Sequence, residues 1–216
     1  MAATKKDTKA TEAKTKATTS IMLKPIQIGK AEFRILGLSP LIQNQMSSKA
    51  KEQIRLKQQQ LKKTKERIAK NPEQDYQDAM YLLSDGSPAV PITAIKNSMC
   101  EAAHNDMGFP KTILRKALFF HADEGILTRI DTPGVKMRED PVKVGKGVID
   151  LRYRPEYAEW SVLLRFEYDK DWLQLEDIVN LAERAGFGIG IGEWRPEKDG
   201  LFGRFCVDRD SVKVLA

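Results

Sequence analysis

The sequence has few of the residues from which disulfide frameworks and metal sites are built. Its 216 residues include two cysteines, Cys100 and Cys206, without a CxxC spacing, and two histidines, His104 and His121. Two isolated cysteines are typical of buried thiols in a reducing compartment, and they exclude a disulfide-dense secreted scaffold. The sequence shows no Ser-His-Asp arrangement and no metal-ligand spacing. We therefore expect no metal and no cofactor.

Long hydrophobic runs are also missing. No stretch approaches the roughly 18 apolar residues of a membrane span. The first 20 residues are polar throughout, so they lack the apolar region of a signal peptide. These absences predict a soluble, cytoplasmic protein without a membrane partner.

Charge is abundant, and it is unevenly distributed. The net charge is +6, from 36 Lys and Arg against 30 Asp and Glu. Residues 1–20 carry +3 and residues 49–70 carry +7, which leaves the rest of the chain at −4. The basic character therefore belongs to a tail and one internal segment, and it favours a polyanionic partner for those segments.

The tail, residues 1–22, is rich in Ala, Thr and Lys and has no aromatic residue. Such a composition cannot bury enough apolar surface to order itself, so the tail is predicted to be disordered. It is either a solubilising extension or an arm that tethers nucleic acid.

The basic segment, residues 47–70, is predicted to be a long helical insertion. It is rich in helix formers, Ser48 can cap its N-terminus, and Ile54, Leu61 and Ile68 recur every seven residues. This helix is either a solvated face without a ligand or a basic arm on phosphates, whose contacts would make binding sensitive to salt.

Alternating hydrophobic residues predict several strands. They mark residues 26–42, with a bulge at Gly29, two short segments at 115–123 and 125–131, and a long antiparallel hairpin over 148–169. In contrast, residues 132–147 resemble a loop, and residues 74–84 fit a strand or a short helix equally well.

Helical spacing follows Pro91, up to about His104, and recurs over Asp171–Gly186, where Gly186 is well placed as the C-cap. The order of these elements predicts an α+β domain over residues 23–216. The simplest architecture is a ferredoxin-like antiparallel sheet with helices on one face.

A glycine-rich stretch, GFGIGIGEWRPEKDGLFGRFCVD, spans residues 186–208 between a predicted helix and a predicted strand. Glycine weakens both element types, so the run is either a tight structural connection or a site where another molecule approaches the backbone. It fits neither a dinucleotide fingerprint nor a P-loop, because those motifs precede a helix. Arg195 and Arg204 can pair with phosphate and Trp194 offers a stacking face, whereas Glu193 and Glu197 repel phosphate.

This arrangement resembles the glycine-rich loop of the RAMP superfamily, the RNA-binding backbone and processing subunits of CRISPR effector complexes. The matching residues are Gly188, Gly190 and Gly192, then Gly200, Gly203, Arg204 and Phe205. Two weaker similarities are ILGLSPLI, at residues 35–42, and VPITAIKNSMCEAA, at residues 90–103, in which Ala94 and Lys96 hold positions usually near the guide strand.

The resemblance implies an RRM-like fold, single-stranded RNA held through its shape and phosphates, and oligomerisation side by side along the strand. It also implies the cytoplasm of a bacterial or phage-infected host cell, where a stand-alone viral or mobile-element relative would act. The candidate nucleic-acid contacts are Gly188, Gly190, Gly192, Trp194, Arg195, Lys198, Gly203, Arg204, Lys96, Lys51, Arg55, Lys62, Arg152 and Arg154.

We therefore expect a non-catalytic protein that binds single-stranded nucleic acid, with RNA favoured over DNA. One alternative is a metal-independent endoribonuclease of the CRISPR RNA-processing type, with His104 or His121 as general base. Another is a protein-interaction module that mimics or inhibits a CRISPR complex.

Overall fold

The computed structural model describes residues 24–59, 71–144 and 147–215. Its centre is a four-stranded antiparallel sheet in the order β4-β8-β1-β9. These strands are β1 (Ile28–Gly37), β4 (Leu118–His121), β8 (Ser161–Asp169) and β9 (Phe205–Leu215). This strand order, with one helical crossover in each half of the chain, is the ferredoxin-like arrangement. The predicted α+β fold is confirmed.

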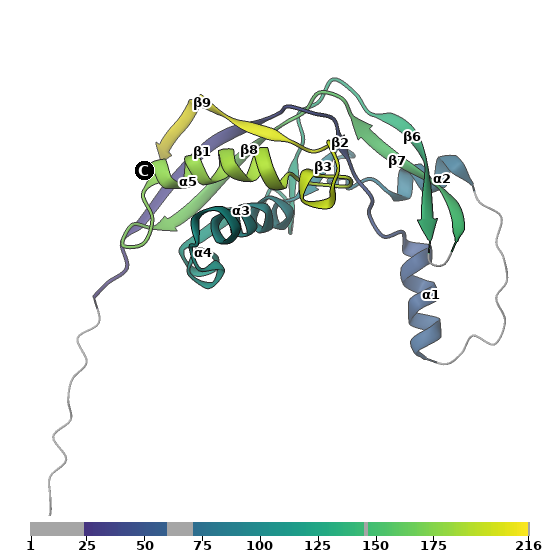
Figure 1. Ribbon diagram of the computed structural model, residues 1–216, viewed down its shortest axis with the longest axis horizontal. Coiled ribbons are helices and arrows are strands. Elements are labelled where there is room, and N and C mark those ends of the chain that lie inside the picture. The colour runs from purple at the N-terminus through teal and green to yellow at the C-terminus, as the bar shows by residue number, and fades with distance from the viewer. Residues whose placement is uncertain (1–23, 60–70, 145–146, 216) are drawn as a thin grey trace, which may run out of the picture.

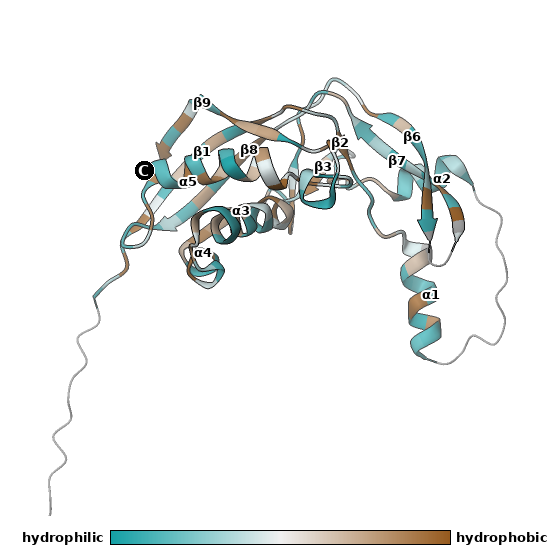
Figure 2. Cartoon of the chain, in the orientation of Figure 1, coloured by the Kyte–Doolittle hydropathy of each residue, from teal (hydrophilic) through white to brown (hydrophobic). Residues whose placement is uncertain are grey.

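Three helices cover one face of this sheet (Figure 1). They are α3 (Ile92–Met107), α4 (Lys111–Ala117) and α5 (Leu175–Arg184). Alternation along β1 places Ala31, Phe33 and Ile35 in the core at 0% exposure, and Phe33 packs edge-on against Phe166 of β8. Figure 2 shows the same alternation of hydropathy along the strands. Because only one face of the sheet is covered, the period-two pattern was visible in the sequence.

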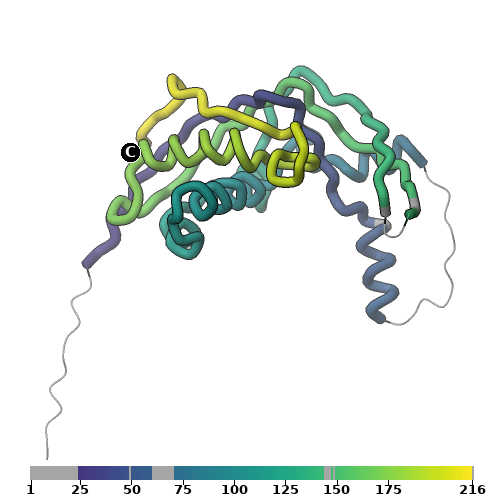
Figure 3. The backbone as a smooth tube through the Cα atoms, viewed as in Figure 1, coloured from purple at the N-terminus to yellow at the C-terminus, as the bar shows by residue number. Residues whose placement is uncertain are grey.

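A second sheet, in the order β2-β7-β6, extends from the end of the first one. It consists of β2 (Leu41–Ile42), β6 (Lys136–Val144) and β7 (Val148–Tyr157), accompanied by α1 (Ser48–Gln58) and α2 (Pro72–Asp78). We call β6 and β7 the arm. The backbone trace has the outline of an arch, with the arm and α1 at one end and the C-terminus at the other (Figure 3).

The two ends of the arm segment meet at the central sheet. Asp131, before β6, and Ser161, at the start of β8, exchange two backbone hydrogen bonds of 2.9 Å. We call the central sheet and its helices the body. The chain leaves the body at Asp131, forms the arm and returns to the body at Ser161, beside Asp131.

The predicted hairpin over residues 148–169 is wrong. β7 pairs instead with β6, in a register from Lys136↔Glu156 to Val144↔Val148, while β8 pairs with β1 and β4. The region 132–147, predicted to be a loop, therefore contains a nine-residue strand. Pro141 is tolerated there because β6 is an edge strand, where a missing backbone N–H faces away from the ladder.

Some helix boundaries also differ from the prediction. The N-cap of α1 is Ser47 rather than Ser48, because the Ser47 hydroxyl accepts a hydrogen bond from the Ala50 N–H at 3.1 Å. The ambiguous region near residue 74 forms the helix α2. Residues Lys111–Ala117 are helical, so the predicted strand begins only at Leu118.

Helix α3 follows Pro91 as predicted, but it ends at the left-handed Gly108 rather than near His104. The tail 1–22 and residues 60–70 of the basic segment, including Lys62, lie outside the described residues. In the part of the chain that the structure describes, no helix is long and apolar enough to cross a membrane.

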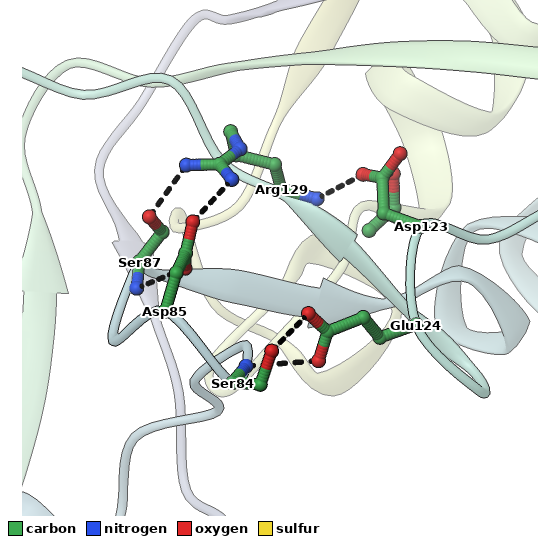
Figure 4. Close-up of polar contacts among 7 residues, drawn as sticks. Ser84, Asp85, Ser87, Asp123, Glu124 and Arg129 are labelled. Atoms are coloured by element: carbon green, nitrogen blue, oxygen red, sulfur yellow. Dashed lines mark hydrogen bonds and ion pairs between the residues drawn. The ribbon is translucent and has the colours of Figure 1, made fainter.

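A surface network of polar contacts fixes the strand that leads into α3 (Figure 4). That strand, β3 (Ala89–Pro91), pairs with β5 (Leu127–Arg129). The Arg129 guanidinium donates to Asp85 at 2.6 Å and to Ser87 at 2.5 Å, and Glu124 accepts from the Ser84 N–H and hydroxyl. The hydrogen bond from Arg129 lowers the pKa of Asp85 to about 2.

Candidate nucleic-acid interface

The glycine-rich loop and helix α3 face each other across a surface depression of about 440 Å³, which we call the α3–loop groove. Helix α4 contributes one side chain to it, that of Arg115. The lining residues are Ala94, Asn97, Ser98, Glu101, Arg115, Ile189, Gly190, Ile191, Gly192, Arg195 and Glu197. Two segments that the sequence singled out separately, 90–103 and 186–208, thus form one site.

The loop begins with an unusual helix end. Helix α5 continues through a π-helical turn, Ala185–Ile189, and stops at Gly190, whose φ is 70°. Gly186 is therefore not the C-cap that the sequence predicted, since it lies inside the turn. The π-turn carries the backbone toward α3, so that Ile189 and Gly190 line the groove.

Most of the loop glycines are required because the loop packs on itself. A Cβ on Gly203, whose φ is 67°, would lie 1.7 Å from the carbonyl oxygen of Ile191, and a Cβ on Gly200 would lie 1.7 Å from that of Trp194. Three further glycines would also place a Cβ within 3.0 Å of another atom: Gly186, Gly190 and Gly192. For these five positions the structure supports the structural-connection interpretation of the glycine run.

Gly188 is different. Its φ is not left-handed, and a Cβ there would meet no described atom within 4 Å. Packing within the chain therefore does not explain this glycine. Next to it, the Phe187 side chain is 71% exposed, and the Arg204 guanidinium lies over the Phe187 ring at 5.0 Å. An exposed aromatic ring with an adjacent arginine is the combination on which single-stranded bases stack.

The charges lining the groove are largely paired. Arg195 donates to one oxygen of Glu197 from Nε at 3.0 Å and from Nη2 at 2.6 Å, and its Nη1 donates to the Gly192 carbonyl at 3.2 Å. Glu101 pairs with Lys111 at 2.5 Å, and this hydrogen bond lowers the pKa of Glu101. The exposed Arg115 makes no ion pair within 4 Å among the described residues.

Sequence reasoning missed Arg115 and Phe187. Arg115 was missed because it begins the segment 115–123, which was predicted to be a strand, whereas the structure places it in the helix α4. Phe187 lies in the glycine-rich stretch, and its position between Gly186 and Gly188 was a signal that could have identified it. Arg115 lines the α3–loop groove, and Phe187 precedes by two residues Ile189, which also lines it.

Lys96 does not line the groove. Its ammonium donates to the Arg115 carbonyl at 3.1 Å and lies 4.6 Å from the centre of the exposed Phe119 ring. Burial lowers the pKa of Lys96, and the nearby charge of Arg115 lowers it further. Lys96 and Phe119 form a second cation–aromatic pair at the surface.

Two other loop residues of the prediction are at the surface. Trp194 is 41% exposed, and its ring packs edge-on against Phe202. Lys198 is exposed at the end of the 3₁₀ turn Pro196–Lys198. Both side chains are accessible from solvent, and neither is among the residues that line the groove.

Arg154 is buried, in contrast to the RNA-facing position predicted for it. Its side chain is 5% exposed, and its guanidinium lies 3.7 Å from Asp140 and 3.8 Å from Glu193 of the loop. Two of its nitrogens and one Asp140 oxygen have no hydrogen-bond partner among the described residues. The loop covers this end of β7, so Arg154 joins the arm to the loop rather than facing solvent.

The remaining predicted contacts belong to the arm and α1. Arg152 pairs with Asp150 at 3.2 Å, Arg55 pairs with Glu52 at 2.7 Å, and Lys51 is exposed. Figure 1 shows α1 at the end of the arch away from α3. The structure therefore does not bring these residues to the α3–loop groove.

The two histidines lie on separate elements. His104 is exposed near the end of α3, and His121 is exposed at the end of β4, 3.6 Å from Glu167. Neither lines the groove. Within the described ranges, no group of three or more His, Cys, Asp or Glu residues could hold a metal ion.

No family model and no curated protein matches this chain. Among solved structures, a similar chain occurs in the cryo-EM structure of the Type III-B Cmr-beta bound to cognate target RNA. The TM-score is 0.47 and the identity 10%, over 87% of this chain and 61% of the other one. This chain thus spans less than two thirds of that neighbour, and similarity at this level assigns it no ligand and no partner.

Proposed function

We propose that the protein binds single-stranded nucleic acid at the α3–loop groove without cleaving it. One observation carries the proposal: α3, the glycine-rich loop and Arg115 converge on one groove. The same loop also carries the open backbone of Gly188 and the exposed Phe187–Arg204 pair. Because Gly188 has no side chain, a phosphate or a base can come close to the backbone there. The ring offers a stacking face, and the guanidinium groups offer fork-shaped phosphate contacts.

RNA is the preferred ligand in this proposal, and bound copies lie side by side along the strand. Both points follow from the resemblance of the loop to RAMP proteins. A contact to the 2′-hydroxyl would distinguish RNA from DNA. Light scattering with RNAs of increasing length tests the assembly, since the mass should then grow in steps of one 24.4 kDa chain plus RNA.

The binding experiment measures the fluorescence anisotropy of a labelled single-stranded RNA, and of DNA of the same sequence, over a range of salt concentrations. Arg115→Gln and Arg204→Gln should each weaken binding and reduce the slope of log K against log salt by about 0.7 for each lost phosphate contact. Arg209→Gln is the matched control, because Arg209 pairs with Glu176 on another part of the surface. Equal losses in all three variants would refute the groove as the site.

A second test uses the open glycine. Gly188→Ala and Gly134→Ala should both fold normally, because neither Cβ meets a described atom within 4 Å and neither φ is left-handed. Gly188→Ala should weaken RNA binding, whereas Gly134→Ala should not. Unchanged binding by Gly188→Ala would show that no ligand approaches the backbone at this point.

The non-catalytic part of the proposal has its own test. End-labelled RNA should stay intact during incubation with the protein, with and without EDTA. Cleavage that survives EDTA and is lost in folded His104→Ala or His121→Ala would establish an endoribonuclease instead.

A further inference from the structure

We propose that Glu197 is a built-in competitor for Arg195, so that nucleic acid reaches this arginine only against the carboxylate of the same loop. The inference rests on the proposed function, because it concerns the strength of binding at the α3–loop groove. Both side chains line the groove, with exposed fractions of 32% for Arg195 and 25% for Glu197.

The backbone holds the two side chains together. Pro196, between them, starts the 3₁₀ turn, and the Arg195 carbonyl accepts hydrogen bonds from the N–H groups of Lys198, at 2.8 Å, and Gly200, at 3.1 Å. Residue Asp199 then reverses the chain with a φ of 57°. This turn keeps the two side chains close to each other, and the planar guanidinium loses less side-chain entropy for each hydrogen bond that it forms.

The pair occupies much of the hydrogen-bonding capacity of Arg195. A guanidinium has five N–H donors, and three nitrogens already donate here, two to Glu197 and one to the Gly192 carbonyl. A phosphate must either displace the carboxylate or use the remaining donors beside it, where like charges repel. By either route Glu197 weakens phosphate binding. Because both side chains are partly buried, salt screens this ion pair less than it would screen a fully exposed one.

The rest of the groove makes this competition decisive. Among its described lining residues, Arg195 and Arg115 are the cationic ones, and only Arg115 lacks an ion pair. One accessible cation gives a weak electrostatic attraction, so a ligand must also gain contacts from stacking or from the backbone. Glu197 thus makes the groove discriminate against polyanions that offer phosphate alone.

The experiment compares Glu197→Gln with Glu176→Gln. Both changes remove one negative charge from an Arg–Glu pair, but the pair of Glu176 and Arg209 lies outside the groove. Glu197→Gln should bind single-stranded RNA roughly threefold to tenfold more tightly than wild type, as expected for loss of one competing ion pair. Its salt slope should steepen by about 0.7, because Arg195 then contacts a phosphate. Glu176→Gln should change neither quantity.

A double-mutant cycle tests the route through Arg195. In the Arg195→Gln background, Glu197→Gln should give no further gain in affinity; a gain that persists would overturn competition for this arginine. Two results would overturn the inference and leave the proposed function standing. In the first, Glu197→Gln and Glu176→Gln change RNA binding equally. In the second, wild type binds RNA and Glu197→Gln binds it with the same affinity. If neither wild type nor Glu197→Gln binds RNA or DNA, the proposed function fails, and the inference fails with it.

Discussion

The self-packing of the glycine-rich loop predicts a graded series of glycine-to-alanine effects. Gly203 combines a left-handed φ of 67° with a close neighbour, since its Cβ would lie 1.7 Å from the Ile191 carbonyl oxygen. Gly108 has a similar φ of 64° but no atom within 4 Å of a Cβ, and Gly134 has neither constraint. The three positions therefore separate backbone strain from steric overlap.

The expected magnitudes follow from these differences. A left-handed alanine costs roughly 1–2 kcal/mol, so Gly108→Ala should lower the free energy of unfolding by about 1 kcal/mol. Gly203→Ala bears the same strain and also forces the two backbone segments apart. That movement breaks the 3.0 Å hydrogen bond from the Ile191 N–H to the Gly203 carbonyl, which adds roughly 1 kcal/mol, and it disturbs the loop packing. The total should be about 3 kcal/mol, whereas Gly134→Ala should be neutral or slightly stabilising.

Urea unfolding followed by tryptophan fluorescence measures the series. Trp194 lies in the loop itself and is one of the three tryptophans that contribute to this signal. Circular dichroism follows the central sheet and helices in parallel. If Gly203→Ala were no less stable than Gly108→Ala, the close approach of Gly203 to Ile191 would not exist in solution.

Three further predictions concern the body of the protein. Asp140→Leu leaves buried Arg154 without its closest carboxylate, breaks the 2.7 Å pair of Asp140 with Arg138, and should cost about 3 kcal/mol in urea unfolding. The double variant Asp140→Leu/Arg154→Leu should recover part of this loss, since it removes the unpaired buried charge but does not restore the pair with Arg138. Because its pKa is lowered to about 2, Asp85 should stabilise the fold above pH 3.8, and this stabilisation should be lost as the pH falls through 2. In the variant Arg129→Gln, the titration midpoint of Asp85 measured by NMR should return toward 3.8. Phe33→Ala empties a fully buried site and should cost roughly 3–5 kcal/mol by thermal or urea unfolding.

The central sheet and the helices α3 and α5 were predictable because each exposes one face. Ala31, Phe33 and Ile35 alternate with exposed or half-buried neighbours, so β1 carries the pattern of a half-buried strand. The strand β6 carries no such pattern, since it is charged and contains Pro141. Its pairing with β7 depends on a change of sheet at Trp160, which local alternation does not encode. The period-two signals on the two sides of the predicted turn in residues 148–169 thus belong to strands of two different sheets.

The candidate site was predictable in outline only. The sequence singled out the glycine-rich loop and the helix after Pro91 as separate segments, and the structure joins them in one groove. The internal pairing of Arg195 with Glu197 could be suspected from their spacing, whereas the burial of Arg154 could not. Its burial depends on which segment covers the base of the arm, a contact between residues far apart in the sequence.

The arm begins and ends at neighbouring points of the central sheet, where Asp131 and Ser161 share two backbone hydrogen bonds. Chain length between two such points changes the entropy of loop closure only slowly. The body therefore places little restriction on how long the intervening segment is. In protein engineering, this junction is the natural place to graft a shorter or foreign hairpin onto the scaffold. In evolution, the same junction lets the outer part of the arm change in length, provided that the contact of Arg154 with Glu193 of the loop is kept.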